Sequence, residues 1–336
     1  MSRGWWRGCG RTRDAMTRTA VVLFNLGGPD RLEAVRPFLF NLFRDKAIIG
    51  LPLPLRLIVA WLIAKRRETV ARDIYARMGG ASPLLAETQA QARALEAALG
   101  PDHKAFIAMR YWHPLTDACA ALVAAWKPDR VVLLPLYPQR STTTTDSSFA
   151  AWRRAIARYR LDAPERAIES YPTMDGLVAA QAELIAPLLD EAGQGGAGPG
   201  VRLLLSAHGL PKRIVARGDD YPKQVEMTAR AVVERLARPG LDWMVCYQSR
   251  VGPLEWIGPY TDDEIRRAGA ERKALVVAPI AFVSEHSETL VELDMDYRRL
   301  AEGAGVTTYL RAPAVGTHPA FIAGLAGLVR AAEQGG

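Results

Sequence analysis

Residues 19–30, TAVVLFNLGGPD, decide the fold of this chain. The stretch is an apolar, β-branched run that ends in Gly-Gly-Pro, a pattern typical of a buried parallel strand that stops at a tight turn. Residues 201–212, VRLLLSAHGLPK, repeat this design. A second matched pair, residues 129–148 and residues 273–292, runs from an apolar strand through a proline and an aromatic residue into a polar segment that opens a helix. The same two units in the same order predict two similar halves.

Helical periodicity fills the gaps between these strands, for example in residues 84–100 and 219–237. Alternating strands and helices predict parallel sheets with helices on both faces. We therefore expect an α/β fold of two similar Rossmann-like domains, each a doubly wound parallel sheet. In such folds ligands bind beyond the carboxyl ends of the strands, so the active site is expected in the cleft between the two domains.

The expected domain limits follow from composition. Residues 19–190 form the N-terminal domain, the Gly-rich stretch 191–200 is a linker, and residues 201–312 form the C-terminal domain. Residues 313–336 contain an amphipathic helix that we expect to pack back on the N-terminal domain. Residues 1–18 carry arginines but no apolar run of a secretory signal, so we expect a disordered tail, with either Met1 or Met16 as the start of translation.

Charge and cysteine content restrict the class of protein. The 336 residues carry 43 Lys and Arg against 36 Asp and Glu, a net charge of +7, which favours an anionic partner such as acidic lipid or a carboxylate ligand. No helix-turn-helix or basic stripe is present, so no nucleic acid is expected as a partner. Cys9, Cys119 and Cys246 are scattered and form no CxxC pair, which argues against a zinc knuckle or a disulfide framework and favours a reducing, cytoplasmic location.

Residues 38–67, here called the apolar lip, differ in character from the rest of the chain. Their apolar part, residues 51–64, contains two prolines and Arg56, and it is shorter than the roughly 17 to 25 residues that a membrane span needs. One interpretation is a buried core helix. The other is an apolar surface with the basic rim Lys65-Arg66-Arg67, which could rest on an anionic membrane and admit a hydrophobic ligand.

Acidic residues gather around one histidine in residues 284–294, SEHSETLVELD. If this segment is a helix, Glu285, Glu288 and Glu292 are spaced i, i+3, i+7 and share one face. A solvated acidic face is the ordinary interpretation. However, the segment follows a strand that reads as buried and includes His286. Carboxylates and imidazole bind divalent metals, and carboxylates held close in a cleft raise each other's proton affinity. The cluster is therefore a candidate route for cations and protons.

His208 follows a buried strand directly and is flanked by small residues, which favours a functional role at a strand end. The pattern around Ser206 lacks the GxSxG of a nucleophile elbow. Gly27-Gly28-Pro29 is not a phosphate loop, because no GxGxxG or GK[ST] is present and a proline has no N–H to donate. The other histidines at 103, 113 and 318 are predicted to be structural.

Nine ordered motifs between residue 19 and the last helix resemble those of the ferrochelatases, which insert ferrous iron into a porphyrin at the end of haem synthesis. The motifs are LFNLGGPD (23–30), AKRR (64–67), GGASP (79–83), RYWHPLT (110–116), LYPQRSTTTTDSS (136–148), SAHGLP (206–211), YPKQV (221–225), YQSRVGPLEWIGP (247–259) and SEHSETLVELD (284–294). The resemblance implies a chelatase-like fold of two Rossmann-like domains with the porphyrin between them.

The resemblance also implies roles for individual residues. His208 and Glu288 are the central catalytic pair, with His286 beside them, and the Fe²⁺ path comprises His208, Glu288, Glu292 and Glu285. Residues that line the porphyrin pocket or hold its propionates are Leu26, Arg67, Tyr75, Ser82, Arg110, Tyr111, Gln248, Ser249 and Trp256. A porphyrin carries two inner N–H protons that must leave as the metal enters, so a proton acceptor is needed near the ring centre, and His208 is our choice.

Two features that differ among ferrochelatases allow predictions of the porphyrin substrate and of the cofactor. Leu26 stands where relatives acting on coproporphyrin usually have tyrosine, which favours protoporphyrin IX. Three scattered cysteines cannot supply the four thiolates of an iron–sulfur cluster, so no tightly bound cofactor is expected and Fe²⁺ is a substrate.

We expect a monomer or weak dimer in the cytoplasm, peripheral on the inner face of the membrane. The alternatives are a chelatase for another metal or tetrapyrrole (cobalt, nickel or coproporphyrin III) and a tetrapyrrole-binding protein without catalysis.

Overall fold

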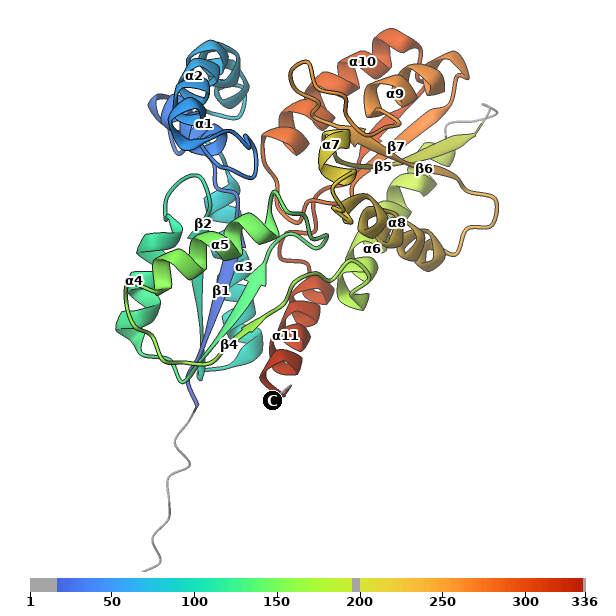
Figure 1. The fold of residues 1–336 in the computed structure, drawn as a ribbon. Coiled ribbons are helices and arrows are strands. Elements are labelled where there is room, and N and C mark those ends of the chain that lie inside the picture. Colours follow the sequence, from blue (N-terminus) through green and yellow to red (C-terminus); the bar gives the residue numbers. More distant parts are fainter. Residues whose placement is uncertain (1–16, 195–199, 335–336) are drawn as a thin grey trace, which may run out of the picture.

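Two parallel four-stranded sheets form the centre of the computed structural model, which describes residues 17–194 and 200–334. The first sheet has the order β2-β1-β3-β4, and the second has the equivalent order β6-β5-β7-β8 (Figure 1). The strands are β1 (Thr19–Asn25), β2 (His103–Met109), β3 (Arg130–Pro135), β4 (Glu165–Ala167), β5 (Val201–His208), β6 (Asp242–Gln248), β7 (Ala274–Pro279) and β8 (Tyr309–Arg311). The α/β fold of two similar domains is confirmed.

Both faces of each sheet are covered by helices, as the buried strands require. In β1, Val21 and Leu23 pack under α3 on one face, whereas Val22 and Phe24 pack under α4 and α5 on the other. The second sheet is covered by α8 on one face and by α9 and α10 on the other. These helices are α3 (Leu84–Leu99), α4 (Thr116–Trp126), α5 (Thr145–Ile156), α8 (Tyr221–Leu236), α9 (Thr261–Ala270) and α10 (Tyr297–Ala304).

Two helices cross between the halves. α6 (Asp175–Gly193) follows the first sheet in the chain but packs on β7 and α8 of the second, and α11 (Pro319–Gln334) follows the second sheet but packs on α3 and β3 of the first (Figure 1). The two helices also touch each other, so closely that a Cβ at Gly176 would lie 2.2 Å from the carbonyl oxygen of Ala320. The strands of the first sheet lie within residues 19–190 and those of the second within residues 201–312, while α6 reaches from the first range onto the second sheet.

Parts of the predicted organisation lie outside the described residues. The expected tail at 1–18 is described only at its last two residues. In the expected linker at 191–200, α6 continues to Gly193, and residues 195–199 are not described.

The apolar lip, residues 38–67, lies on two helices that pack on each other, α1 (Val35–Phe43) and α2 (Leu53–Ala76), and the short η1 (Leu32–Ala34) precedes them after β1. Only Ala60, Ala64 and Tyr75 of α2 are buried. The exposed apolar side chains of this region are Leu51, Leu53, Leu55, Leu57, Ile58, Trp61, Leu62 and Val70. The interpretation as a buried core helix is wrong, because most of the apolar side chains in residues 51–64 are exposed and only Ala60 and Ala64 are buried there.

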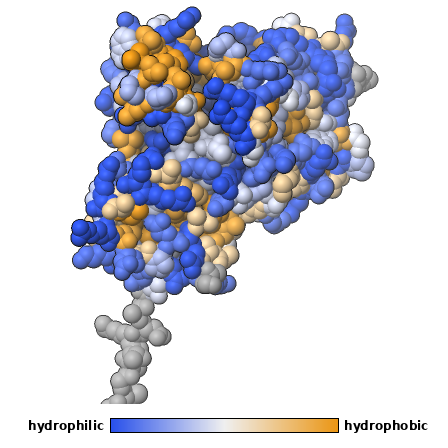
Figure 2. Space-filling model, viewed as in Figure 1, coloured by the Kyte–Doolittle hydropathy of each residue, from blue (hydrophilic) through white to orange (hydrophobic). Residues whose placement is uncertain are grey.

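Figure 2 shows the resulting apolar surface over α1 and α2. Among the described helices, none is long and apolar enough to cross a membrane.

Candidate active site

His208 is the last residue of β5 and stands at the carboxyl end of the second sheet. Its Nδ1 lies 2.5 Å from the carbonyl oxygen of Gly209. Because a carbonyl oxygen only accepts hydrogen bonds, we assign the ring proton to Nδ1. Nε2 then presents a lone pair toward Glu288, whose Oε1 is 3.6 Å away. In its neutral form this imidazole is ready to accept a proton on that side.

Glu288 joins two histidines. Its Oε2 lies 3.4 Å from Nε2 of His286, and its Oε1 faces His208. Burial raises the pKa of Glu288, but the positive charges of the two imidazoles in their protonated forms, together with the hydrogen bond to His286, outweigh burial and lower the pKa to about 2. The carboxylate is therefore ionised throughout the neutral pH range, between two groups that can carry protons.

The acidic segment folds differently from the predicted single helical face. The helix begins only after His286, whose N–H donates to the Thr289 hydroxyl (3.0 Å), and it continues as a π-helix, η2 (Glu288–Asp296). Glu285 precedes the helix, where it accepts hydrogen bonds from Nη1 of Arg311 (2.9 Å) and from the N–H of Ala314 (3.0 Å). The predicted i, i+3, i+7 arrangement is therefore wrong for Glu285. Its carboxylate is paired with Arg311 at the end of β8.

Glu292 is held by four donors. Its carboxylate accepts hydrogen bonds from the Ser249 N–H (2.8 Å), the Gln248 amide (3.2 Å), the Tyr297 hydroxyl (3.0 Å) and the Ser249 hydroxyl. Burial and the neighbouring Glu288 raise its pKa. Gln248 and Ser249, predicted from the resemblance to contact substrate, thus hold Glu292, and Gln248 also donates to the carbonyl oxygen of Glu288 (3.0 Å).

Arg110 and Tyr111 follow the carboxyl end of β2 and surround Asp45. Arg110 donates to Oδ2 of Asp45 (2.6 Å), as do the hydroxyls of Tyr111 (3.0 Å) and Ser147 (2.5 Å). Burial raises the pKa of Asp45, but Arg110 and the hydrogen bonds outweigh it, so the pKa is lowered. Sequence reasoning missed Asp45. Its only local signal is an acidic residue between basic neighbours in the otherwise apolar lip.

The lip helix reaches the central pair at its carboxyl end. Tyr75 of α2 is buried, and burial raises its pKa, while its hydrogen bond to Ser287 lowers the pKa and the nearby charge of Glu288 raises it. Directly after α2, Arg77 donates to Oδ1 of Asp296, the last residue of η2 (2.7 Å). Through these contacts the structure brings Tyr75 to Ser287 and Glu288, which precede and begin η2.

The remaining predicted substrate residues lie on several elements. Trp256 is tilted over His208, with ring centroids 6.1 Å apart. Ser82 packs beneath Gly28, where an added Cβ would lie 2.4 Å from the Ser82 hydroxyl oxygen. Leu26 contacts the small core between the lip and the first sheet. Arg67 is half-buried on α2, and burial lowers its pKa.

No three His, Cys, Asp or Glu side chains in residues 17–194 and 200–334 are arranged to hold a metal ion. His208 and His286 each approach Glu288, but Glu285 and Glu292 are bound to Arg311 and to Ser249 instead. Of the four residues predicted for the metal path, the structure therefore brings His208 and Glu288 into direct contact.

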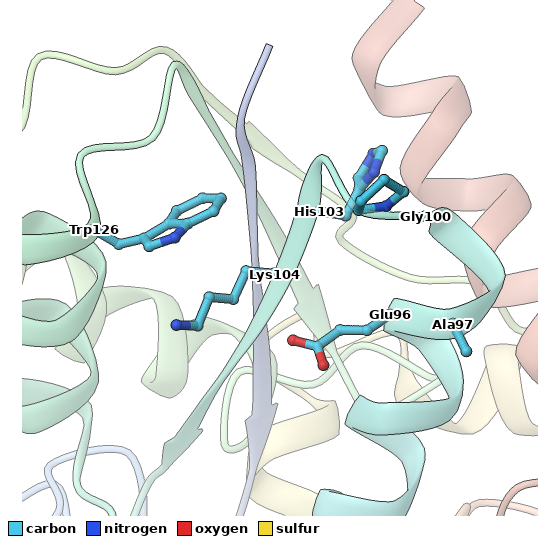
Figure 3. A pocket seen from close by; sticks show the side chains of 7 residues that line it. Glu96, Ala97, Gly100, His103, Lys104 and Trp126 are labelled. Atoms are coloured by element: carbon cyan, nitrogen blue, oxygen red, sulfur yellow. The ribbon is translucent and has the colours of Figure 1, made fainter. Parts of the chain in front are cut away.

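A separate pocket of about 430 Å³ opens at the other end of the first sheet, beside the start of β2. Figure 3 shows the side chains that line this pocket: Lys104 of β2 and Trp126 of α4 lie on one side of β2, and Glu96 of α3 lies nearby. Nε2 of His103 lies 3.1 Å from Glu333, so this histidine joins β2 to α11. Parallel α/β folds bind ligands at the carboxyl ends of their strands, and this pocket is at the amino ends.

Comparison with known proteins agrees with the geometry. A sequence model of the ferrochelatase family matches residues 18–333. Proteins named ferrochelatase are similar over most of their length: that of Caulobacter vibrioides is 58% identical over 93% of this chain and 90% of its own. That of Hyphomonas neptunium is 52% identical over 94% and 88%.

Solved structures with a similar fold include sirohydrochlorin chelatases. SirB from Bacillus subtilis with Fe³⁺ has a TM-score of 0.52 at 12% identity and covers 95% of this chain and 96% of its own. SirB from Bacillus subtilis subspecies spizizenii with cobalt has a TM-score of 0.54 at 10% identity and covers 94% and 95%. At this level of identity the likeness shows the fold alone.

Proposed function

The chain belongs to the ferrochelatase family and acts in haem synthesis, and from that premise we propose that His208 and Glu288 insert Fe²⁺ into protoporphyrin IX. The observation that carries the proposal is the contact of Nε2 of His208 with an ionised Glu288 at the carboxyl ends of the strands. We further propose that the porphyrin binds between the two sheets. The fold class and the strand-end position of the pair support this location.

In the proposed reaction Nε2 of His208 accepts a proton from an inner pyrrole nitrogen. Two N–H bonds break as the iron ion binds the four ring nitrogens, so two protons leave and carry away the +2 charge that the iron brings. Glu288 stabilises the imidazolium that forms, and the second pyrrole proton passes by way of Glu288 to His286, which lies 3.4 Å from it. Both imidazoles must then release their protons to solvent before the next turnover.

Substrate selection rests on the walls of the site. Trp256 beside His208 and Leu26 at the end of β1 offer apolar contacts to a flat macrocycle, and Arg67 offers a cation to a propionate. Leu26 has no hydroxyl group, which supports protoporphyrin IX over the more carboxylated coproporphyrin III. We propose no resident cofactor, with Fe²⁺ entering as substrate.

The test of this function is an anaerobic assay of the purified protein with Fe²⁺ and protoporphyrin IX, followed by haem absorbance. Coproporphyrin III and Co²⁺ or Ni²⁺ serve as competing substrates. Faster insertion into coproporphyrin III would overturn the choice of porphyrin, and tight porphyrin binding without insertion of any metal would favour a carrier protein.

Glu292→Gln is expected to raise the apparent KM for iron by roughly 3- to 10-fold and to change kcat less than a substitution at Glu288. The reason is that Glu292 lies one turn further along η2 than Glu288, and its carboxylate binds Ser249 instead of a histidine. Steady-state assays over an iron series check this, with Asp294→Asn, on the same helix but paired with Arg298 (2.7 Å), as the control. An unchanged iron KM would remove Glu292 from the metal path.

We propose that the apolar lip binds the membrane surface peripherally. Ile58 and Leu62 are 58% and 52% exposed, and Lys65 stacks over Trp61 at 5.3 Å from the ring centroid. Exposed apolar side chains next to a tryptophan and basic residues suit the boundary between lipid headgroups and acyl chains.

Replacing Lys65 and Arg66 by glutamine should therefore weaken binding to anionic vesicles, by about 1 kcal/mol per charge near the surface, with a loss that shrinks as salt rises. Turnover with detergent-solubilised porphyrin should stay within about twofold. Co-sedimentation with vesicles of phosphatidylserine and phosphatidylcholine measures the effect. The matched control for the loss of two positive charges is Arg153→Gln with Arg154→Gln, since both arginines are exposed on α5, away from the lip. Equal binding of the wild type to neutral and anionic vesicles at low salt would contradict the proposal.

A further inference from the structure

The segment that leads from β7 into η2 carries His286 and is held largely by side chains from other elements. The carbonyl oxygen of Ile280 accepts hydrogen bonds from the side-chain amides of Gln181 (3.0 Å) and Gln139 (3.3 Å). Closer to the histidine, Val283 and Ser284 are bound by Gln91 of α3. Three buried glutamines thus attach this segment to α6, to the loop before α5 and to α3.

Gln91 uses its whole amide group. Its Nε2 donates to the carbonyl oxygens of Val283 (2.8 Å) and Gly316 (3.0 Å), and its Oε1 accepts from the Ser284 hydroxyl (3.1 Å). The side chain is 1% exposed. Leaving a buried polar group without partners costs about 1–3 kcal/mol, so the three bonds select one position of Val283 and Ser284 relative to α3.

The same helix is also attached to the end of β1. Thr88, one turn before Gln91, accepts a hydrogen bond from the side chain of Asn25, the last residue of β1 (3.0 Å). Ser82, two residues before the start of α3, lies next to Gly28 in the turn after β1. Because an α-helix is stiff over one turn, α3 sets the separation between the end of β1 and the segment of Val283 and Ser284.

We propose that Gln91 is a positioning residue for metal insertion: from α3 it fixes Val283 and Ser284 so that His286 and Glu288 face His208. Ser284 lies two residues before His286, and His286 is in turn fixed by the bond from its N–H to Thr289 and by its contact with Glu288. The inference rests on the proposed function of that pair. It adds a structural connection between the porphyrin side of the site, at the end of β1, and the histidine side.

The test uses Gln91→Met, which keeps the length of the side chain and removes all three hydrogen bonds. We expect kcat for Fe²⁺ insertion to fall at least tenfold, with the KM for porphyrin within about threefold of wild type, because Gln91 touches neither the ring nor His208. Gln139→Met is the matched control. Gln139 is also a buried glutamine that binds the segment, through Ile280, and donates to Thr228 (2.8 Å), but it acts further from His286.

A merely structural role predicts that both variants lose kcat in proportion to their loss of Tm. Positioning predicts similar losses of Tm but a loss of kcat only in Gln91→Met. Equal losses of kcat, or a Gln91→Met enzyme with wild-type kcat, would overturn the inference.

Two further measurements bear on the route. Combining Gln91→Met with Ser284→Ala should give a less than additive loss of kcat, since both remove the same hydrogen bond; additive losses would show that Gln91 does not act through Ser284. The ring resonances of His286 in NMR spectra, assigned with His286→Gln, should shift in Gln91→Met and stay in place in Gln139→Met. The NMR measurement does not depend on enzyme activity. If the wild type inserts no iron, the proposed function is contradicted, but the His286 resonances still show whether Gln91 positions His286.

Discussion

His208→Ala is expected to lower kcat for metal insertion by about 1000-fold, equivalent to about 4 kcal/mol in the barrier, while porphyrin still binds. The substitution removes the Nε2 that faces Glu288 and leaves Trp256 in place. Stopped-flow haem formation measures the rate, and quenching of porphyrin fluorescence measures binding.

His103→Gln, at the amino end of β2 beside Glu333, is the control for the loss of an imidazole in general. It should retain nearly full activity. If His208→Ala keeps a tenth of wild-type turnover, a change of only about 1.4 kcal/mol, His208 is not the proton acceptor.

Glu288→Gln is expected to reduce kcat by roughly 100- to 1000-fold at every pH between 6 and 9, about 2.7 to 4 kcal/mol. Glutamine has nearly the same shape but no charge to stabilise an imidazolium on His208 or His286. Because the pKa of Glu288 is lowered to about 2, the wild-type carboxylate is ionised over this whole range, so the effect of the substitution should not vary with pH. A loss confined to one limb of the pH profile would contradict this assignment.

The same substitution should also change stability with a predictable sign. A carboxyl whose pKa is lowered on folding stabilises the folded state above its unfolded pKa, near 4.5, and this contribution is lost as the pH falls toward 2. Glu288→Gln should therefore have a lower Tm than wild type at pH 7, and the difference should shrink in acid. Thermal unfolding by circular dichroism at a series of pH values tests it.

Strands that are buried on both faces could be predicted from the sequence, whereas short edge strands could not. β1, β3, β5 and β7 form the centres of the sheets, so each reads as a continuous apolar run. β4 and β8 have three residues each and lie at sheet edges. Their sequences, ERA and YLR, carry no pattern that distinguishes a strand from a loop.

Site residues at strand ends could likewise be predicted, but their partners could not. His208 and the acidic segment follow buried strands, which is a local signal. The pairing of Glu285 with Arg311, 26 residues apart, and that of Arg110 with Asp45, 65 residues apart, depend on how strands and helices meet in space. The phase of η2 was missed for a related reason, since the bond from the His286 N–H to Thr289 decides where the helix starts.

The exchange of α6 and α11 has a consequence for biosynthesis. Phe321, Ile322 and Leu325 of α11 are buried beside Val132 and Leu134 of β3, yet they are translated after the whole second sheet. While the ribosome makes the second half, α3 covers only part of this apolar face of the first sheet, and the part that α11 later covers stays exposed. Exposed apolar surface of this kind favours aggregation and chaperone binding. The first half of the nascent chain therefore cannot complete its own core, and the protein reaches its native state only after its last helix has left the exit tunnel.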